Sequence, residues 1–194
     1  MNAIFQRMLL ILTGACLILA ASAGWVLAQN YPSGTFNFEP RVGLFGTTNK
    51  RVNTIWTYGA AAGGFITDNL ALELEGMGVA IDQTRPTPMG GDNSENVNRP
   101  TSGFATNGNL RWHMFTSTQA SMYVGAGLGG LWTNYKVPYN GFESSLTENC
   151  SLGGTLALTE HMSLKGEFRY WHIGQFTDQG ASALGGTLGV NFSF

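Results

Sequence analysis

The eleven residues from Leu184 to Phe194 constrain the fold more than any other segment of this chain. The larger apolar side chains all fall on one parity, which is occupied by Leu184, Leu188, Val190, Phe192 and Phe194. Small or polar residues occupy the other parity. A period of two predicts a β-strand with one apolar face and one polar face. A strand of this kind, ending on an aromatic residue, is expected in a barrel whose apolar face meets lipid and whose polar face meets the lumen.

The first 28 residues are predicted to be a signal peptide. Arg7 supplies a positive charge, and an apolar run follows from Met8 to Ala21. Small residues then offer two cleavage sites, after Ala23 and after Ala28, and we favour the second. The alternative is that the run is retained as a membrane anchor. With cleavage after Ala28, residues 29–194 form one domain that is exported to the bacterial outer membrane.

The composition excludes several other classes of protein. Charged residues make up only 11% of the chain, and the net charge of −2 implies no nucleic-acid partner. The sequence shows no Cys/His spacing for zinc and no phosphate-binding loop, so no metal and no cofactor are expected. Cys150 is the single cysteine beyond the predicted leader, which leaves no intrachain disulfide. The 27 glycines and 12% aromatic residues are typical of a small transmembrane barrel.

Eight alternating segments predict an all-β, eight-stranded antiparallel barrel of the outer-membrane type. Short connectors at 67–69, 116–119 and 159–161 alternate with longer ones, as expected of a barrel with tight periplasmic turns and long outer loops. The longest connector, Asp82–Ser102, is rich in Pro and Gly and is predicted to contain no strand. The predicted strands are Thr35–Phe45, Thr54–Ile66, Leu70–Ile81, Gly103–Phe115, Ala120–Tyr135, Ser144–Leu158, Met162–Ile173 and Ala183–Phe194.

Parity places four acids and four bases on the polar, inward faces of these strands. They are Glu39, Glu73, Glu75 and Glu167, with Arg41, Arg111, Lys165 and Arg169. An eight-stranded barrel is only wide enough for its own side chains, so we expect a closed lumen neutralised by ion pairs. A proton or ion path along these charges is the alternative. A soluble barrel of the lipocalin kind, with its apolar face inward, also remains possible from the strand pattern alone.

The three histidines have different expected surroundings. His113 lies on the inward parity and is expected to form a hydrogen bond in the lumen, whereas His161 falls in a tight turn exposed to solvent. His172 shares the outward parity of Leu164 and Tyr170 and precedes an outer loop. A titratable group at the outer boundary between lipid and water is a candidate for function. The competing interpretation is an interfacial histidine beside Tyr170 and Trp171, taken as residues of the aromatic belt.

Three segments resemble the PagL-type lipid A 3-O-deacylases. They are Ile66–Leu74, Asn109–Leu128 with its short turn, and Phe168–Ile173 followed by a nine-residue loop and the terminal strand. The resemblance implies an eight-stranded barrel that hydrolyses an acyl ester of lipid A on its outer wall, with lipopolysaccharide as its partner. It also implies a serine nucleophile two residues after the histidine base, then an asparagine, and a later acidic residue that orients the base.

The sequence departs from this pattern at the nucleophile. His172 matches the base, but Gly174 stands at the serine position and Gln175 at the asparagine position. Asp178 is the only carboxylate after His172, which makes it the candidate for the orienting acid. Thr177, Ser182 or an activated water would have to replace the missing hydroxyl.

Three functions therefore remain open. The first is lipid A ester hydrolysis with His172 as the base and Gln175 as the oxyanion donor, which requires a hydroxyl or a water beside His172. The second is a non-catalytic barrel with a structural or surface-interaction role. The third, a small porin, requires a wetted and continuous lumen.

Overall fold

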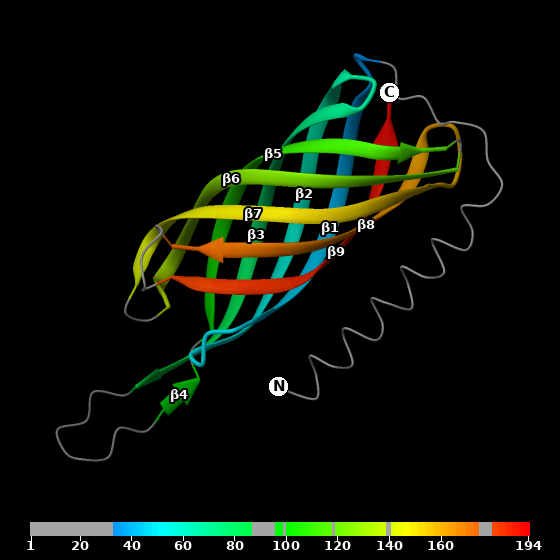
Figure 1. Ribbon diagram of the computed structural model, residues 1–194. Helices are drawn as coiled ribbons and strands as arrows, with labels where there is room; N and C mark the ends of the chain where they lie inside the picture. The colour runs from blue at the N-terminus through cyan, green and yellow to red at the C-terminus, as the bar shows by residue number, and fades with distance from the viewer. Residues whose placement is uncertain (1–32, 87–95, 99, 118, 139–140, 175–179) are drawn as a thin grey trace, which may run out of the picture.

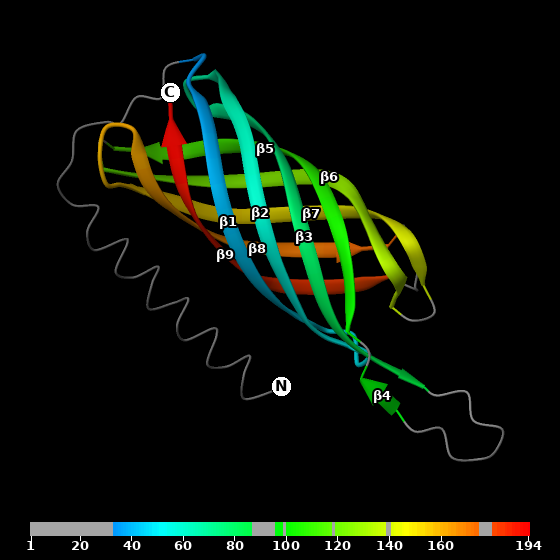
Figure 2. The same ribbon diagram turned by 180° about the vertical axis from the view of Figure 1, so that it is seen from behind.

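A computed structural model describes residues 33–86, 96–98, 100–117, 119–138, 141–174 and 180–194. The predicted signal peptide lies outside these ranges. Eight strands form a closed antiparallel barrel in the order β2-β1-β9-β8-β7-β6-β5-β3, and pairing of β2 with β3 completes the circle (Figures 1 and 2). The strands are β1 (Phe36–Thr47), β2 (Val52–Thr67), β3 (Leu70–Pro86), β4 (Asn96–Asn98), β5 (Thr101–Thr116), β6 (Ala120–Val137), β7 (Phe142–Ala157), β8 (Met162–Ile173) and β9 (Ala181–Ser193).

The predicted all-β barrel of eight strands is confirmed, and the expectation for one connector is wrong. Asp82–Ser102 was expected to contain no strand, but β3 continues to Pro86 and pairs with the additional strand β4. This hairpin projects beyond the barrel (Figure 1). A backbone hydrogen bond of 2.8 Å from the Thr84 amide to the Arg51 carbonyl ties its base to the neighbouring loop. Backbone pairing therefore extends as far as Pro86, which lies at the end of β3 and is opposite Asn96.

The barrel has a turn end and a loop end. Tight turns close the turn end, where the Phe194 amide donates to the Phe36 carbonyl at 2.9 Å. The longer connectors, the β3–β4 hairpin among them, lie at the loop end (Figures 1 and 2). No helix among the described residues is long and apolar enough to cross a membrane.

Alternation of side chains gives the barrel an apolar outer wall. Aliphatic residues form its central band, among them Val42, Leu72, Leu110, Leu128 and Leu188. Aromatic residues lie on either side of this band: Phe36, Phe38, Trp112, Phe115 and Phe194 toward the turn end, and Trp56, Tyr58, Phe104, Trp132 and Tyr170 toward the loop end. An aliphatic band between two aromatic girdles is the expected outer surface of a transmembrane barrel. The soluble alternative, with charges outside, is therefore wrong.

The lumen is filled by two layers of different chemistry. The layer nearer the turn end contains the eight predicted charges, all buried. The layer nearer the loop end is apolar, and its buried residues include Phe45, Ile55, Met77, Ile81, Leu131, Trp171 and Ile173. The sequence predicts the ion-paired charges of the lumen but not this apolar layer. The loop-end half instead resembles the core of a soluble protein.

Candidate functional site

Arg41 is the centre of the charged layer. Its guanidinium donates to Glu39 at 2.8 Å, to Glu73 at 2.7 Å and to Glu75 at 2.8 Å. Arg169 lies across the lumen on β8, where it contacts Glu75 at 2.7 Å and Glu167 at 2.6 Å. The two arginines thus share Glu75, and strands that are far apart around the barrel are joined through its centre.

Arg111 and Lys165 complete the charged layer. Arg111 pairs with Glu73 and, at 2.7 Å, with Glu167. Lys165 lies 2.6 Å from Glu39 and 3.1 Å from Glu73. Each carboxylate contacts at least two cations, so the lumen neutralised by ion pairs is confirmed. Such a network is strongly coupled: loss of one member leaves buried charges without compensation.

Aromatic and polar side chains fill the turn end of the lumen. His113 is buried there, and its Nδ1 lies 3.2 Å from the Ser121 hydroxyl. Its ring packs against Phe65 and Tyr123, with centroid distances of 4.9 and 5.2 Å. The expected role of His113 in the lumen is confirmed, and His161 is exposed in its turn as expected.

The outer wall carries a second polar group, at the loop end of β7, β8 and β9. His172 faces outward and is half-buried, and its Nδ1 lies 3.1 Å from the Ser182 hydroxyl. The Tyr170 hydroxyl lies 2.8 Å from the same Ser182 oxygen. We refer to Tyr170, His172 and Ser182, together with Glu148, as the wall cluster.

Glu148 is the member of the wall cluster that was missing from the sequence-based candidates. It is directly opposite His172 in the β7–β8 pairing, and His172 is opposite Ser182 in the β8–β9 pairing. The Glu148 Oε1 atom is buried and has no hydrogen-bond partner among the described residues. A signal was present in the sequence, since Glu148 shares the outward parity of Leu146 and Leu152. An acid on an apolar parity is rare in a lipid-facing wall.

Gly174 has a structural reason to be glycine. Its φ is +128°, a conformation that side chains other than glycine rarely adopt. A Cβ at this position would lie 2.7 Å from the Gly180 Cα. A Cβ added at Gly180 would lie 2.7 Å from the His172 Cε1 and 2.8 Å from its Nε2. A hydroxyl-bearing side chain at position 174 therefore does not fit here.

The remaining residues that the sequence analysis named have different outcomes. Gln175, Thr177 and Asp178 lie outside the described residues. Trp171 was expected in the aromatic belt, which is wrong: it points into the apolar layer, fully buried, with its ring centroid 5.7 Å from that of Phe45. Trp171 shares the parity of Lys165, Glu167 and Arg169, so the alternation of the strand already points it into the lumen. Among the described residues, no group of three His, Cys, Asp or Glu side chains could hold a metal ion.

Comparisons with known proteins fit this architecture. Residues 10–194 match the family described as "Outer membrane protein beta-barrel domain". The search of curated proteins gives no match.

Solved structures of small barrels superpose on the chain. Neisserial surface protein A has a TM-score of 0.60 at 14% identity, covering 83% of this chain and 99% of its own. OprG from Pseudomonas aeruginosa has a TM-score of 0.59 at 11% identity, with 86% and 99% covered. The N-terminal β-barrel domain of P. aeruginosa OprF has a TM-score of 0.54 at 20% identity, with 86% and 100% covered. At these identities the similarity concerns the fold alone.

Proposed function

Since the chain belongs to the outer membrane protein beta-barrel domain family, we propose that it serves in the bacterial outer membrane as a closed, non-conducting barrel with a structural or surface-interaction role. The observation that carries this proposal is the filled lumen. Ion-paired charges occupy one half, and buried apolar side chains occupy the other. Water and solutes have no favourable path through a dry apolar layer, so the lumen favours a scaffold over a porin.

The β3–β4 hairpin supports the surface part of this role. It extends the sheet beyond the loop end, where a partner outside the cell can reach it (Figure 1). Lys50 and Arg51 are exposed in the adjacent β1–β2 loop, which also lies at this end.

Reconstitution in a planar bilayer tests the closed lumen. The wild-type barrel is expected to give no steady ion conductance. Leu131→Ala and Trp171→Ala together remove two large side chains from the apolar layer, and they define the signal that an opened lumen would produce. Steady conductance by the folded wild-type protein, comparable to that of the opened variant, would contradict the proposal.

Ester hydrolysis on the outer wall is the second candidate, and the contact between His172 and Ser182 favours it. Ser182 supplies a hydroxyl beside the imidazole, which hydrolysis by His172 requires. In this reaction the Ser182 Oγ would attack an ester carbonyl while the His172 Nδ1 takes its proton. The imidazolium would then protonate the departing alkoxide, and water would release the acyl group from Ser182 by the reverse proton transfers. The resemblance to lipid A deacylases suggests lipid A as the substrate.

Mass spectrometry of lipid A, from an outer-membrane host with and without the protein, separates the two candidates. Hydrolysis predicts loss of one ester-linked acyl chain, abolished in Ser182→Ala and His172→Ala. Ser163→Ala, on the inward face of β8, is the matched control and should leave the loss intact. Heat-modifiable gel mobility shows that each variant is folded. An unchanged lipid A spectrum with folded wild-type protein would leave the non-catalytic barrel as the function.

A further inference from the structure

The end of β6 leaves the paired wall of the barrel. Its pairing with β5 ends at Thr133, and its pairing with β7 passes from Trp132 directly to Val137. In the described strands, residues 134–136 therefore have no ladder partner on either side. An irregularity of this size bends a strand away from its neighbours. We refer to residues 134–138 as the strap.

Val137 anchors the strap in the lumen. It is 1% exposed and belongs to the apolar layer, together with Leu131 and Trp171. Pro138, the next residue, is also buried. Because the segment before Val137 has left the wall, the side chain can join the apolar layer only if the strap turns inward. The strap therefore covers the outer mouth of the lumen.

Gln83 fastens the strap from inside the barrel. It is fully buried near the end of β3, and its Nε2 donates to the Lys136 carbonyl at 3.1 Å and to the Thr101 Oγ1 at 2.5 Å. Strand β5 separates β3 from β6 in the sheet. The bond from Gln83 to Lys136 therefore reaches past β5 across the mouth of the lumen, which is the position of a latch.

The strap is also held at its start by a side chain. The Ser102 amide donates to the Asn134 Oδ1 at 3.0 Å, next to the latch formed by Gln83 and Lys136. Neither of these bonds belongs to a strand ladder. The strap can therefore lift without separating any pair of strands.

The closed position of the latch has a cost. The Gln83 Oε1 is buried and has no hydrogen-bond partner among the residues that the structure describes. A buried acceptor without a partner loses its hydration and gains nothing in return. Water that enters beneath a lifted strap would restore this hydration, which offsets part of the loss of the bond to Lys136.

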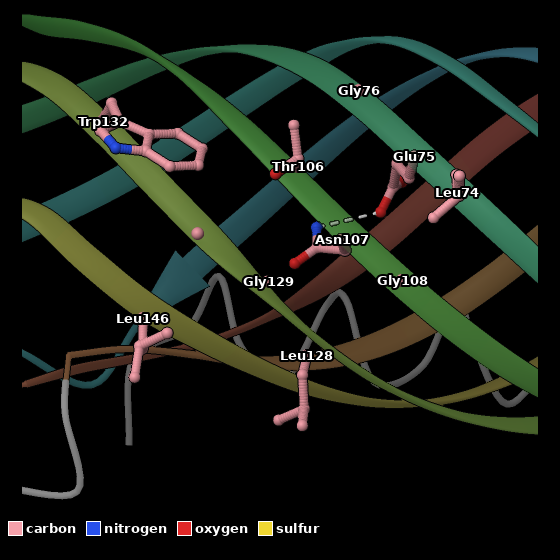
Figure 3. A pocket seen from close by; sticks show the side chains of 11 residues that line it. Leu74, Glu75, Gly76, Thr106, Asn107, Gly108, Leu128, Gly129, Trp132 and Leu146 are labelled. Atoms are coloured by element: carbon pink, nitrogen blue, oxygen red, sulfur yellow. Dashed lines mark hydrogen bonds between the residues drawn. The ribbon is translucent and has the colours of Figure 1, made fainter.

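The wall below the strap is firmly paired. On β5, every residue from Gly103 to His113 has a ladder partner on β6. Figure 3 shows part of this wall, at a groove on its outer side that Trp132 helps to line. Behind the groove, Asn107 donates to Glu75 of the charged layer at 3.2 Å (Figure 3). Any lifting therefore concerns the strap alone.

We propose that the strap is a lid on the outer mouth of the lumen, latched by Gln83, and that it lifts while the strand ladders stay intact. Lifting brings water to the outermost lumen residues, whereas Leu131, Trp171 and the charged layer keep the barrel closed beneath them. The inference rests on the closed barrel proposed above, and it adds a movable seal at the loop end.

Thiol accessibility in detergent micelles, where both ends of the barrel face solvent, tests the strap. Cys150→Ser first removes the exposed native thiol of the exported protein. Val52→Cys then places a probe of similar size, in a buried position directly opposite Gln83 in the β2–β3 pairing. Mass spectrometry follows its reaction with a charged methanethiosulfonate reagent. The rate should be slow, and roughly tenfold faster in Gln83→Glu, as expected for the loss of one hydrogen bond.

Matched variants connect this rate to the latch. Gln83→Glu keeps the shape of the side chain and still accepts a hydrogen bond from Thr101, but its carboxylate repels the Lys136 carbonyl. Thr101→Val removes the other contact of Gln83 and should leave the rate unchanged. Val137→Ala removes the apolar anchor and should also raise the rate, which provides a second test should Gln83→Glu fail to fold.

A second probe position measures how far the opening extends. Ala105→Cys replaces Val52→Cys and lies deeper, four residues beyond Thr101 on β5 in the apolar layer. It should stay unreactive in every variant. Heat-modifiable gel mobility shows that each protein is folded.

Three results would overturn the strap. The first is a rapid reaction of Val52→Cys with Gln83 intact, and the second is an equally slow reaction in Gln83→Glu and Val137→Ala. The third is a reactive Ala105→Cys in Gln83→Glu, which would mean that the whole barrel has loosened. Bilayer conductance separates this inference from the proposed function, because steady conductance of the wild type would contradict the closed barrel whatever the thiol rates are.

Discussion

The charged layer in the lumen and the wall cluster outside are both polar groups in surroundings of low polarity, but their hydrogen bonding differs. Each carboxylate of the charged layer contacts at least two cations, and Arg41 contacts three of the acids. In the wall cluster, Ser182 joins Tyr170 to His172, and Glu148 Oε1 has no partner among the described residues. Polar groups whose hydrogen bonds are complete stabilise a fold, whereas a buried acceptor without a partner lowers its stability.

This comparison predicts that the largest loss of stability follows removal of Arg41. Arg41→Ala leaves three buried acids without their shared cation, and the free energy of unfolding should fall by about 3–5 kcal/mol. Urea titration of the folded barrel in detergent, followed by heat-modifiable gel mobility, measures the change. Lys50→Ala removes the same charge from an exposed loop and should change stability by less than about 0.5 kcal/mol. Equal effects of the two variants would mean that the network contributes nothing.

Trp171 tests the apolar part of the lumen. Trp171→Ala should cost about 3–5 kcal/mol, because it opens a cavity in a close-packed layer. Trp171→Phe should cost much less, since the Trp171 Nε1 is buried without a hydrogen-bond partner among the residues that the structure describes, and its removal offsets part of the lost packing. The same urea titration distinguishes the two. A Phe variant as unstable as the Ala variant would indicate that Nε1 has a bound partner.

Gly174 tests the backbone next to the wall cluster. Gly174→Ala should cost about 1–3 kcal/mol, because its φ of +128° disfavours a side chain and a Cβ would contact Gly180. Gly166→Ala, in extended strand with space for a Cβ, should be neutral within about 0.5 kcal/mol. Thermal unfolding of the two glycine variants in detergent measures this difference in stability. Equal melting temperatures for the two variants would show that the loop adjusts without strain.

Substitution of Glu148 is expected to give the smallest change in the free energy of unfolding, and it should raise this free energy where the other substitutions lower it. Glu148→Leu removes from the outer wall a carboxylate whose buried Oε1 has no partner among the described residues, so the free energy of unfolding should rise by about 1 kcal/mol. Glu75→Leu, by contrast, leaves Arg41 and Arg169 in the lumen without one of their acids and should destabilise. Urea titration of both variants in lipid vesicles compares them directly. A loss of stability in both would place Glu148 in a completed network.

The sequence predicts the charged layer well, because charges and apolar residues alternate strictly where it forms. In Lys165–Arg169, for example, only one parity can face lipid. The apolar layer escaped prediction because Val79, Ile81, Trp171 and Ile173 lie on the inward parity, where polar side chains were expected, but are themselves apolar. Glu148 could have been found, since it interrupts an apolar parity. The contact between His172 and Ser182 needed the register of β8 and β9, which follows from barrel closure and not from any local motif.

The order in which the charged layer can be assembled has a consequence for biogenesis. Strands β1, β3 and β5 supply three acids and two bases, and β8 supplies Lys165, Glu167 and Arg169. Until β8 joins, the earlier strands hold an excess acid and arginines whose partners are incomplete. Burial of that partial set in a bilayer is unfavourable, so a chain truncated before β8 should stay out of the membrane. The arrival of β8 completes the set of charges in the lumen before β9 closes the barrel.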